Sequence, residues 1–178
     1  MLTKKDFLSA YELSLKTNDI NCGDVDPSEH CDSFIELIIN YIKKGSVVRF
    51  QGCGALVVRN KSSRVGFNPK TGEQFIVSAR RSCSMIKTVR SSAKGIMQDA
   101  KITTKKLRFD LGCEIGDHDA ANILVNTFIR MITTVLKGCE DRFSLTSLGA
   151  FSLRKTKSES CLSFTPSKNL KEYLKNQQ

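Results

Sequence analysis

The sequence has few of the residues on which catalytic and metal sites are usually built. It contains two histidines, His30 and His118, and its seven cysteines include no C-x-x-C pair. His30-Cys31 together with Cys22 matches no zinc-ligand template, and His118 lies far away in the sequence. We therefore expect no metal, no cofactor and no enzymatic activity, and we expect His30 to be a solvent-facing helix residue.

Segments that would cross a membrane, direct secretion or bind a nucleotide are also missing. No run approaches the roughly 18 apolar residues of a membrane span. Met1–Asp6 leads directly into an amphipathic pattern rather than into a secretory signal. Gly52-Cys53-Gly54 is not followed by the lysine and hydroxyl residue of a phosphate-binding loop. With an odd number of thiols, these features predict a reducing compartment in which the cysteines are free and mostly buried.

Acidic residues are scarce, above all in one part of the chain. The sequence has 28 Lys and Arg against 18 Asp and Glu, a formal net charge of +10. Residues 49–98 hold ten of the basic residues and a single acid, Glu73. An excess of this kind suits a polyanionic partner. Charge alone leaves a solvated basic surface open as the alternative.

The first hundred residues predict helices around a small set of strands. The expected elements are a helix over Thr3–Lys16, a helix from Pro27 to Gly45, a hairpin over Val47–Val58, a strand over Gln74–Arg80 and a short helix over Thr88–Gln98. Thr3 and Asp6 have the spacing of a capping box. Because two glycines and a proline fall within residues 66–72, this stretch must be a turn. It is the tip of a long, basic extension between strands.

The same order of elements then repeats. The expected elements are a helix from Ile102 to Leu111 capped by Thr103 or Thr104, a helix from Asp117 to Lys137-Gly138, a hairpin over Phe143–Leu153, a strand over Cys161–Phe164 and a helix over Ser167–Leu174. The chain thus divides into copies at 1–98 and 102–178, joined by a short linker. In the second copy the short link Lys155–Ser160 replaces the long basic extension.

These residues resemble the HU/IHF family of bacterial DNA-bending proteins. The match runs through Gly45-Ser46-Val47-Val48 and Gly52-Cys53-Gly54 to Gly66-Phe67-Asn68-Pro69-Lys70-Thr71-Gly72. The arm tip of the family reads G-R-N-P-x-T-G. This sequence has the same residue at every specified position of that motif except the arginine, where it has Phe67. In the second copy, residues 147–151 and 164–172 look like the hairpin turn and the last strand and helix of the family.

The resemblance implies a fold and a mode of action. Family members are intertwined dimers whose two β-arms embrace DNA, so this α+β chain looks like such a dimer fused into one polypeptide with one arm deleted. A single copy would leave an apolar face exposed to water, whereas two copies can each bury the apolar face of the other. The copies are expected to associate within one chain or, if the linker is too short, by swapping between two chains.

By resemblance, the arm would lie along the minor groove of double-stranded DNA and bend it. Pro69 would wedge between base pairs, and Asn68 would fix the turn and reach base edges. Phe67, in place of the family arginine, is expected to stack on a base, to widen the wedge or to pack under the arm. The predicted DNA contacts are Phe67, Asn68, Pro69, Arg59, Lys61, Arg64, Lys70, Arg80, Arg81, Lys87, Arg90, Lys94, Lys168 and Lys171.

No helix that would read base edges is evident, so we expect binding without sequence preference, guided by DNA shape. Bent, nicked or junction DNA and RNA fit the same arm. The rival to DNA binding and compaction is a protein-interaction scaffold of the same fold, which would not need a basic arm. We expect a nucleoid or another DNA-containing compartment; bacterial cytoplasm, organelle and virion stay open.

Overall fold

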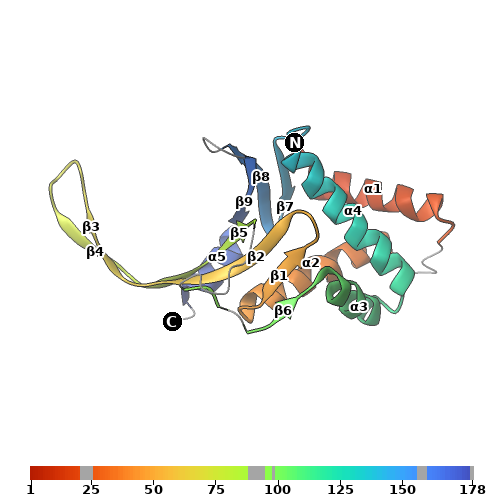
Figure 1. The fold of residues 1–178 in the computed structure, drawn as a ribbon, viewed down its shortest axis with the longest axis horizontal. Coiled ribbons are helices and arrows are strands. Elements are labelled where there is room, and N and C mark those ends of the chain that lie inside the picture. Colours follow the sequence, from red (N-terminus) through yellow and green to blue (C-terminus); the bar gives the residue numbers. More distant parts are fainter. Residues whose placement is uncertain (21–25, 88–94, 98, 156–159, 177–178) are drawn as a thin grey trace.

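The structure is a computed structural model that describes residues 1–20, 26–87, 95–97, 99–155 and 160–176. It is a mixed α+β fold in which helices α1 to α4 gather at one end and a long β arm extends from the other (Figure 1). The first elements are α1 (Lys4–Thr17), α2 (Pro27–Lys43), β1 (Val47–Phe50), β2 (Gly54–Lys61), β3 (Arg64–Phe67), β4 (Gln74–Val77) and β5 (Arg80–Ile86). They are followed by β6 (Lys101–Ile102), α3 (Thr104–Ile115), α4 (His118–Leu136), β7 (Arg142–Leu145), β8 (Gly149–Lys155), β9 (Ser160–Pro166) and α5 (Lys168–Asn176).

The predicted helix starts are confirmed by their capping bonds. The Thr3 N–H donates to Asp6 Oδ2 at 2.7 Å, and the Thr3 side chain accepts from the Asp6 N–H, which completes the capping box of α1. Pro27 is the first residue of α2, and Asp117 caps α4 by accepting from two backbone N–H groups of its first turn. These bonds satisfy N–H groups that have no partner within the helix. None of the helices in the described ranges has the length and apolar character of a membrane span.

The strands form two sheets and a separate ribbon. The strand orders are β5-β2-β1-β6 in the first sheet and β7-β8-β9 in the second, while β3 and β4 pair with each other in the arm. Both predicted hairpins are confirmed, but the linker was predicted wrongly. Lys101–Ile102 is strand β6, which pairs in parallel with β1, and α3 begins only at Thr104 after the cap Thr103. The linker thereby covers a sheet edge that would otherwise be unpaired.

The short helix predicted over Thr88–Gln98 falls mostly outside the described residues. Where the chain is described, at Gly95–Met97, the helix prediction is wrong. The Asn60 N–H donates to the Gly95 carbonyl at 2.7 Å, and the Met97 N–H donates to the Val58 carbonyl at 2.9 Å. The segment therefore pairs with β2 near the root of the arm, through an antiparallel bridge between Ile96 and Arg59.

The first helix of each half begins beside the hairpin of the other half. Leu2, immediately before the cap Thr3, bridges Phe143 in parallel, and its N–H and C=O both bond to β7, at 2.7 and 2.9 Å. Ile102, immediately before the cap Thr103, pairs in parallel with β1. The two halves are therefore tied together by reciprocal strand contacts.

Phe128 of α4 lies at the centre of an aromatic core shared by both halves. It is fully buried. Its ring contacts those of Phe34, Phe50, Phe143, Phe151 and Phe7, with centroids 5.0 to 5.9 Å apart. These rings come from α2, β1, β7, β8 and α1, so a single core cluster spans the chain. Neither half buries these rings by itself.

The expectation that His30 faces solvent is wrong. Its side chain is only 2% exposed, and Nδ1 lies 2.9 Å from the hydroxyl of Tyr11 on α1. Burial lowers the pKa of His30, although the nearby carboxylates of Asp117, Glu29 and Asp26 act in the opposite direction. The sequence around His30 does not predict this burial, because the polar ring gains its hydrogen-bond partner, Tyr11, only when α1 packs against α2.

We expect the free energy of unfolding to fall as the pH drops below about 6.5, the usual pKa of histidine. Below this pH, His30 takes up a proton in the unfolded chain but stays neutral in the folded protein, because burial lowers its pKa in the folded state. Urea unfolding between pH 7 and pH 5 should show this loss, and His30→Gln should reduce its slope. Equal slopes for His30→Gln and wild type would contradict the assignment.

Candidate nucleic-acid interface

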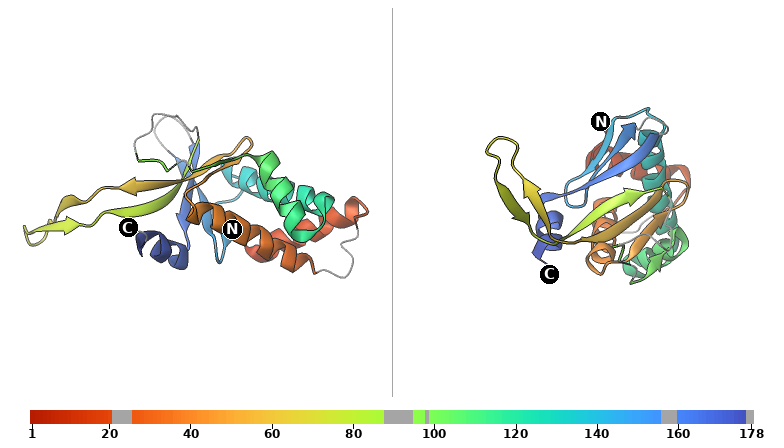
Figure 2. Two further views of the ribbon diagram at one scale, coloured as in Figure 1. Left: turned by 90° about the horizontal axis from the view of Figure 1, so that it is seen from below. Right: turned by 60° about the vertical axis from the view of Figure 1, so that its left-hand side comes forward.

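The arm continues the strands of the first sheet far beyond the body. β2 and β5 pair up to Lys61 opposite Arg80, and β3 and β4 then pair from Arg64 opposite Val77 to Phe67 opposite Gln74. Figure 2 shows from two further directions that the arm stands clear of the body and that α5 lies near its base. The predicted extension between strands is confirmed.

The tip of the arm is a turn closed by its own polar groups. The Gly72 N–H donates to the Asn68 carbonyl at 2.9 Å, and the Lys70 N–H donates to Asn68 Oδ1 at 3.0 Å. Gly72 has a φ of +74°, which favours glycine. Asn68 thus fixes the turn, and Pro69 at its apex is exposed. The exposed ring of Pro69 therefore stands on a turn that these hydrogen bonds close.

Most of the basic residues near the arm lie at its base, where β3 begins at Arg64 and β5 at Arg80. Between Val65 and Ala79 the only charged residues are Lys70 and Glu73, so the distal arm carries no net charge. The root of the arm and α5 instead line a cavity of about 410 Å³, and none of the described residues around it carries a carboxylate. Arg80 lines this cavity and two adjacent ones. We name this surface the cationic groove; its basic residues are Lys61, Arg64, Arg80, Arg81, Lys171 and Lys175.

The groove joins residues that are far apart in the sequence. Lys61 and Arg80 belong to the first half, and Lys171 and Lys175 of α5 belong to the second. Lys175 was not among the predicted contacts. Its spacing of four residues from Lys171 places both on the same helical face, and this signal could have revealed it. Lys168, the first residue of α5, is exposed but lines none of these three cavities.

The remaining predicted residues are distributed differently. Arg59 is partly buried at the root of the arm, and its Nε has no hydrogen-bond partner among the described residues. Lys87 lies at the other end of β5 from Arg80, so the fold does not bring it to the cationic groove. Arg90 and Lys94 lie outside the described residues. Phe67 is 64% exposed on the distal arm, so it does not pack under it.

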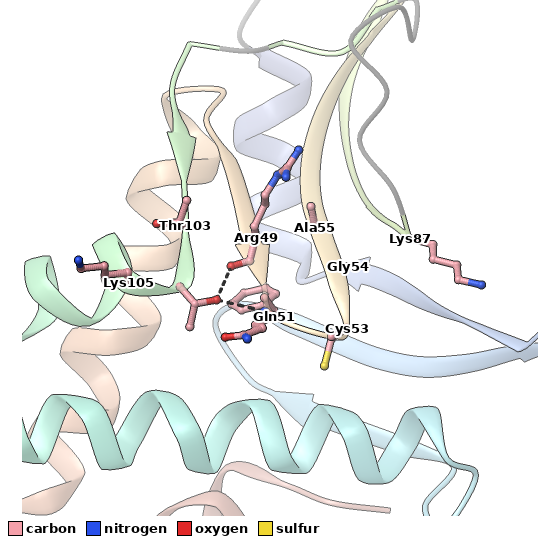
Figure 3. Close-up of a pocket in the computed structure, with 11 residues that line it drawn as sticks. Arg49, Gln51, Cys53, Gly54, Ala55, Lys87, Thr103 and Lys105 are labelled. Carbon is pink, nitrogen blue, oxygen red and sulfur yellow. Dashed lines mark hydrogen bonds between the residues drawn. The ribbon is translucent and has the colours of Figure 1, made fainter.

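A second basic pocket, of about 680 Å³, lies at the turn between β1 and β2 (Figure 3). The Thr104 hydroxyl accepts from the Gln51 N–H and donates to the Arg49 carbonyl, both at 3.1 Å, and so fixes the turn against the start of α3. Arg49, Lys87 and Lys105 line the pocket, but their side chains do not converge on one point. The pocket therefore widens the basic surface without forming a closed anion site. Across the described ranges, no group of three His, Cys, Asp or Glu side chains could hold a metal ion.

The first half of the chain is similar to known proteins. Residues 2–89 match a family model described as "Bacterial DNA-binding protein". Integration host factor subunit alpha from Anaeromyxobacter sp. (strain Fw109-5) is 33% identical over 81 residues, which are 45% of this chain and 76% of that relative. The chain belongs to the HU/IHF family. The subunit alpha of Anaeromyxobacter sp. (strain K) is also 33% identical over 81 residues, again 45% of this chain, with 66% of its own length covered. That of Pasteurella multocida is 46% identical over 56 residues, which are 32% of this chain and 57% of the relative.

Membership of the HU/IHF family accounts for the arm and its tip. The matched residues end at 89 and include the whole arm, from Arg64 to Val77. The match spans about two thirds of the length of the Anaeromyxobacter relatives, and less of the Pasteurella one. The family model does not extend into the second half, where two helices, α3 and α4, precede a three-stranded sheet, β7 to β9, without an arm, as α1 and α2 precede β1, β2 and β5 in the first half.

Proposed function

We propose that this protein binds double-stranded DNA without marked sequence preference and bends it, as an architectural protein rather than an enzyme. The observation that carries the proposal is the arm of an HU/IHF chain that presents Pro69 at an exposed tip, with the cationic groove at its base. DNA compaction within a nucleoid or another DNA-containing compartment is the task that fits this activity. Bent, nicked or junction DNA fits the arm as well as intact duplex.

In this proposal the arm follows the minor groove and Pro69 enters a base step. Its ring has no N–H to satisfy, and the turn bonds of Asn68 and Gly72 hold it outward. Unstacking one step costs on the order of a few kcal/mol, which the additional contacts to bent DNA offset. Phe67, next to the tip, would stack on a base or widen the wedge.

Phosphates would be held at the base of the arm. A groove in which the described charged residues are all basic attracts the DNA backbone and releases its counterions. The proposed phosphate contacts in the groove are Lys61, Arg64, Arg80, Arg81 and Lys171, to which Lys175 is added here. Those proposed outside the groove are Arg59, Lys70, Lys87, Arg90, Lys94 and Lys168. Phosphate contacts carry no sequence information, which agrees with binding guided by shape.

We assign residues 1–98 and 102–178 to two HU/IHF-like copies that pair within one chain. The repeated order of elements supports this assignment, as do the reciprocal contacts of Leu2 with β7 and of Ile102 with β1. The aromatic core shared by both halves supports it as well. Since the second copy has no arm, the complex would carry one kink and a smaller bend than a protein with two arms.

A scaffold that binds only other proteins is the second candidate, favoured by the armless second half. The cationic groove argues against it, because protein contacts alone do not need a surface on which basic residues gather without acids. The salt dependence of binding distinguishes the two candidates.

We expect DNA affinity to fall steeply with salt, since each phosphate contact contributes about 0.9 to the slope of log K against log salt concentration. Arg80 lines three adjoining cavities of the groove. Arg80→Gln should therefore reduce the magnitude of this slope by about 0.9, the contribution of one phosphate contact. Fluorescence anisotropy with a labelled duplex measures the slope. Lys16→Gln, which removes an exposed charge from the last turn of α1, should not change it. An equal decrease of the salt slope in both variants would argue against phosphate binding in the cationic groove. If the wild-type protein does not bind DNA at low salt, the scaffold is favoured.

A further inference from the structure

Helix α5 supplies Lys171 and Lys175 to the cationic groove, whose other basic residues belong to the arm and its root. The groove therefore forms only when α5 is docked beside the arm root. Leu170 and Leu174, which are 3% and 2% exposed, anchor the inner face of the helix in the core. With nine residues, α5 is shorter than the roughly 12 that an isolated helix needs to be stable in water. Its orientation therefore depends on contacts with the rest of the chain.

The start of α5 is held by hydrogen bonds to the second half. Ser167, immediately before the helix, donates its hydroxyl hydrogen to the Ser147 carbonyl at 2.6 Å, and its N–H donates to the Leu148 carbonyl at 3.0 Å. Ser167 Oγ also accepts from the Leu170 N–H at 3.3 Å, as the side chain of a helix cap does. These bonds fix the first turn of α5 next to the turn between β7 and β8. They do not reach the last turn, which carries Lys175.

The last turn of α5 is held by the ring of Tyr173. The Lys43 ammonium group, at the end of α2, lies over this ring with Nζ 4.9 Å from the ring centre. A cation within about 6 Å of an aromatic ring centre is attracted to the negative face of the ring. Because successive helical residues are about 100° apart, Tyr173 lies on the side of α5 away from Lys171 and Lys175. The helix is thus held between α2 on one side and the arm root on the other.

We infer that Tyr173 is a positioning residue for the cationic groove: its ring, held under the Lys43 ammonium group, fixes the rotation of α5 that brings Lys171 and Lys175 to the arm root. This inference rests on the proposed function, in which the groove holds DNA phosphates. It adds a residue that acts on binding without contacting DNA. Because Tyr173 carries no positive charge, its replacement can change the salt dependence of binding only through other residues.

The test measures the salt slope of duplex binding for Tyr173→Leu and Tyr173→Phe in the full chain. Leucine is a strong helix former and keeps apolar bulk against the core, but it removes the aromatic face from Lys43. The magnitude of the slope should therefore fall by between about 0.9 and 1.8, the contributions of one and two phosphate contacts. Phenylalanine retains the aromatic face and should keep the wild-type slope. Asn169→Ala, at an exposed position of the same helix, is the matched control and should keep it as well.

A mutant cycle shows whether Tyr173 acts through the two lysines. In a chain that already carries Lys171→Gln and Lys175→Gln, Tyr173→Leu should not change the slope further, because the contacts that it positions are gone. A further fall in that background, or a wild-type slope for Tyr173→Leu alone, overturns the inference. An equal fall for Tyr173→Phe overturns it too, since the hydroxyl rather than the ring would then be responsible. Failure of the wild-type protein to bind DNA would defeat the proposed function itself and is visible before any variant is compared.

Discussion

Pro69→Ala should leave most of the DNA affinity in place and remove most of the bend. The phosphate contacts at the base of the arm are untouched by the change, but alanine offers no rigid ring at the exposed apex of the turn. Energy transfer between dyes at the two ends of a duplex of about 35 base pairs measures the bend, since free DNA of this length is nearly straight. Wild-type protein should bring the ends together, and the variant should bind with much less transfer.

The control for this experiment is Lys70→Ala, which changes the next residue of the same turn. Its backbone bond to Asn68 Oδ1 needs no side chain, so the turn should persist. The loss of one proposed phosphate contact should lower the affinity, but the bend of the bound duplex should stay close to that with wild type. Equal bending by wild type and Pro69→Ala would show that Pro69 is only a turn residue and that bending is electrostatic. If neither protein binds DNA at low salt, the bending proposal fails and the scaffold takes its place.

Phe128→Ala should destabilise the whole molecule by about 3 to 5 kcal/mol, the usual cost of removing a buried phenylalanine ring. The ring contacts aromatic residues of both halves, so its loss leaves a cavity where they meet. Urea unfolding followed by circular dichroism measures the change. Phe109→Ala removes a ring that is 60% exposed and should cost less than about 1 kcal/mol.

The same unfolding curves test whether the halves pair within one chain. A shared core predicts a single transition for both halves, and pairing within one chain predicts a midpoint that is independent of protein concentration. A midpoint that rises with concentration would show that two chains exchange their halves. Two separate transitions, with only one shifted by Phe128→Ala, would contradict the shared core.

The local elements of this protein follow from its sequence, because short-range interactions determine them. The capping box of Thr3 and Asp6, the start of α2 at Pro27 and the turn from Gly66 to Gly72 depend on residues a few positions apart. Turn and cap residues act through backbone geometry that the sequence alone specifies. The family resemblance, carried by the same arm tip, rests on this local information too.

Only the tertiary structure decided which distant residues meet. The cationic groove needs α5 to lie beside the arm root, and nothing local to Lys175 places it near Arg80. His30 becomes buried only because Tyr11 of a different helix receives its ring. Lys101–Ile102 becomes a strand because the edge of β1 offers it partners. Such contacts depend on how helices and sheets pack across the whole chain, whereas the sequence pattern of one segment reports only the preferences of that segment.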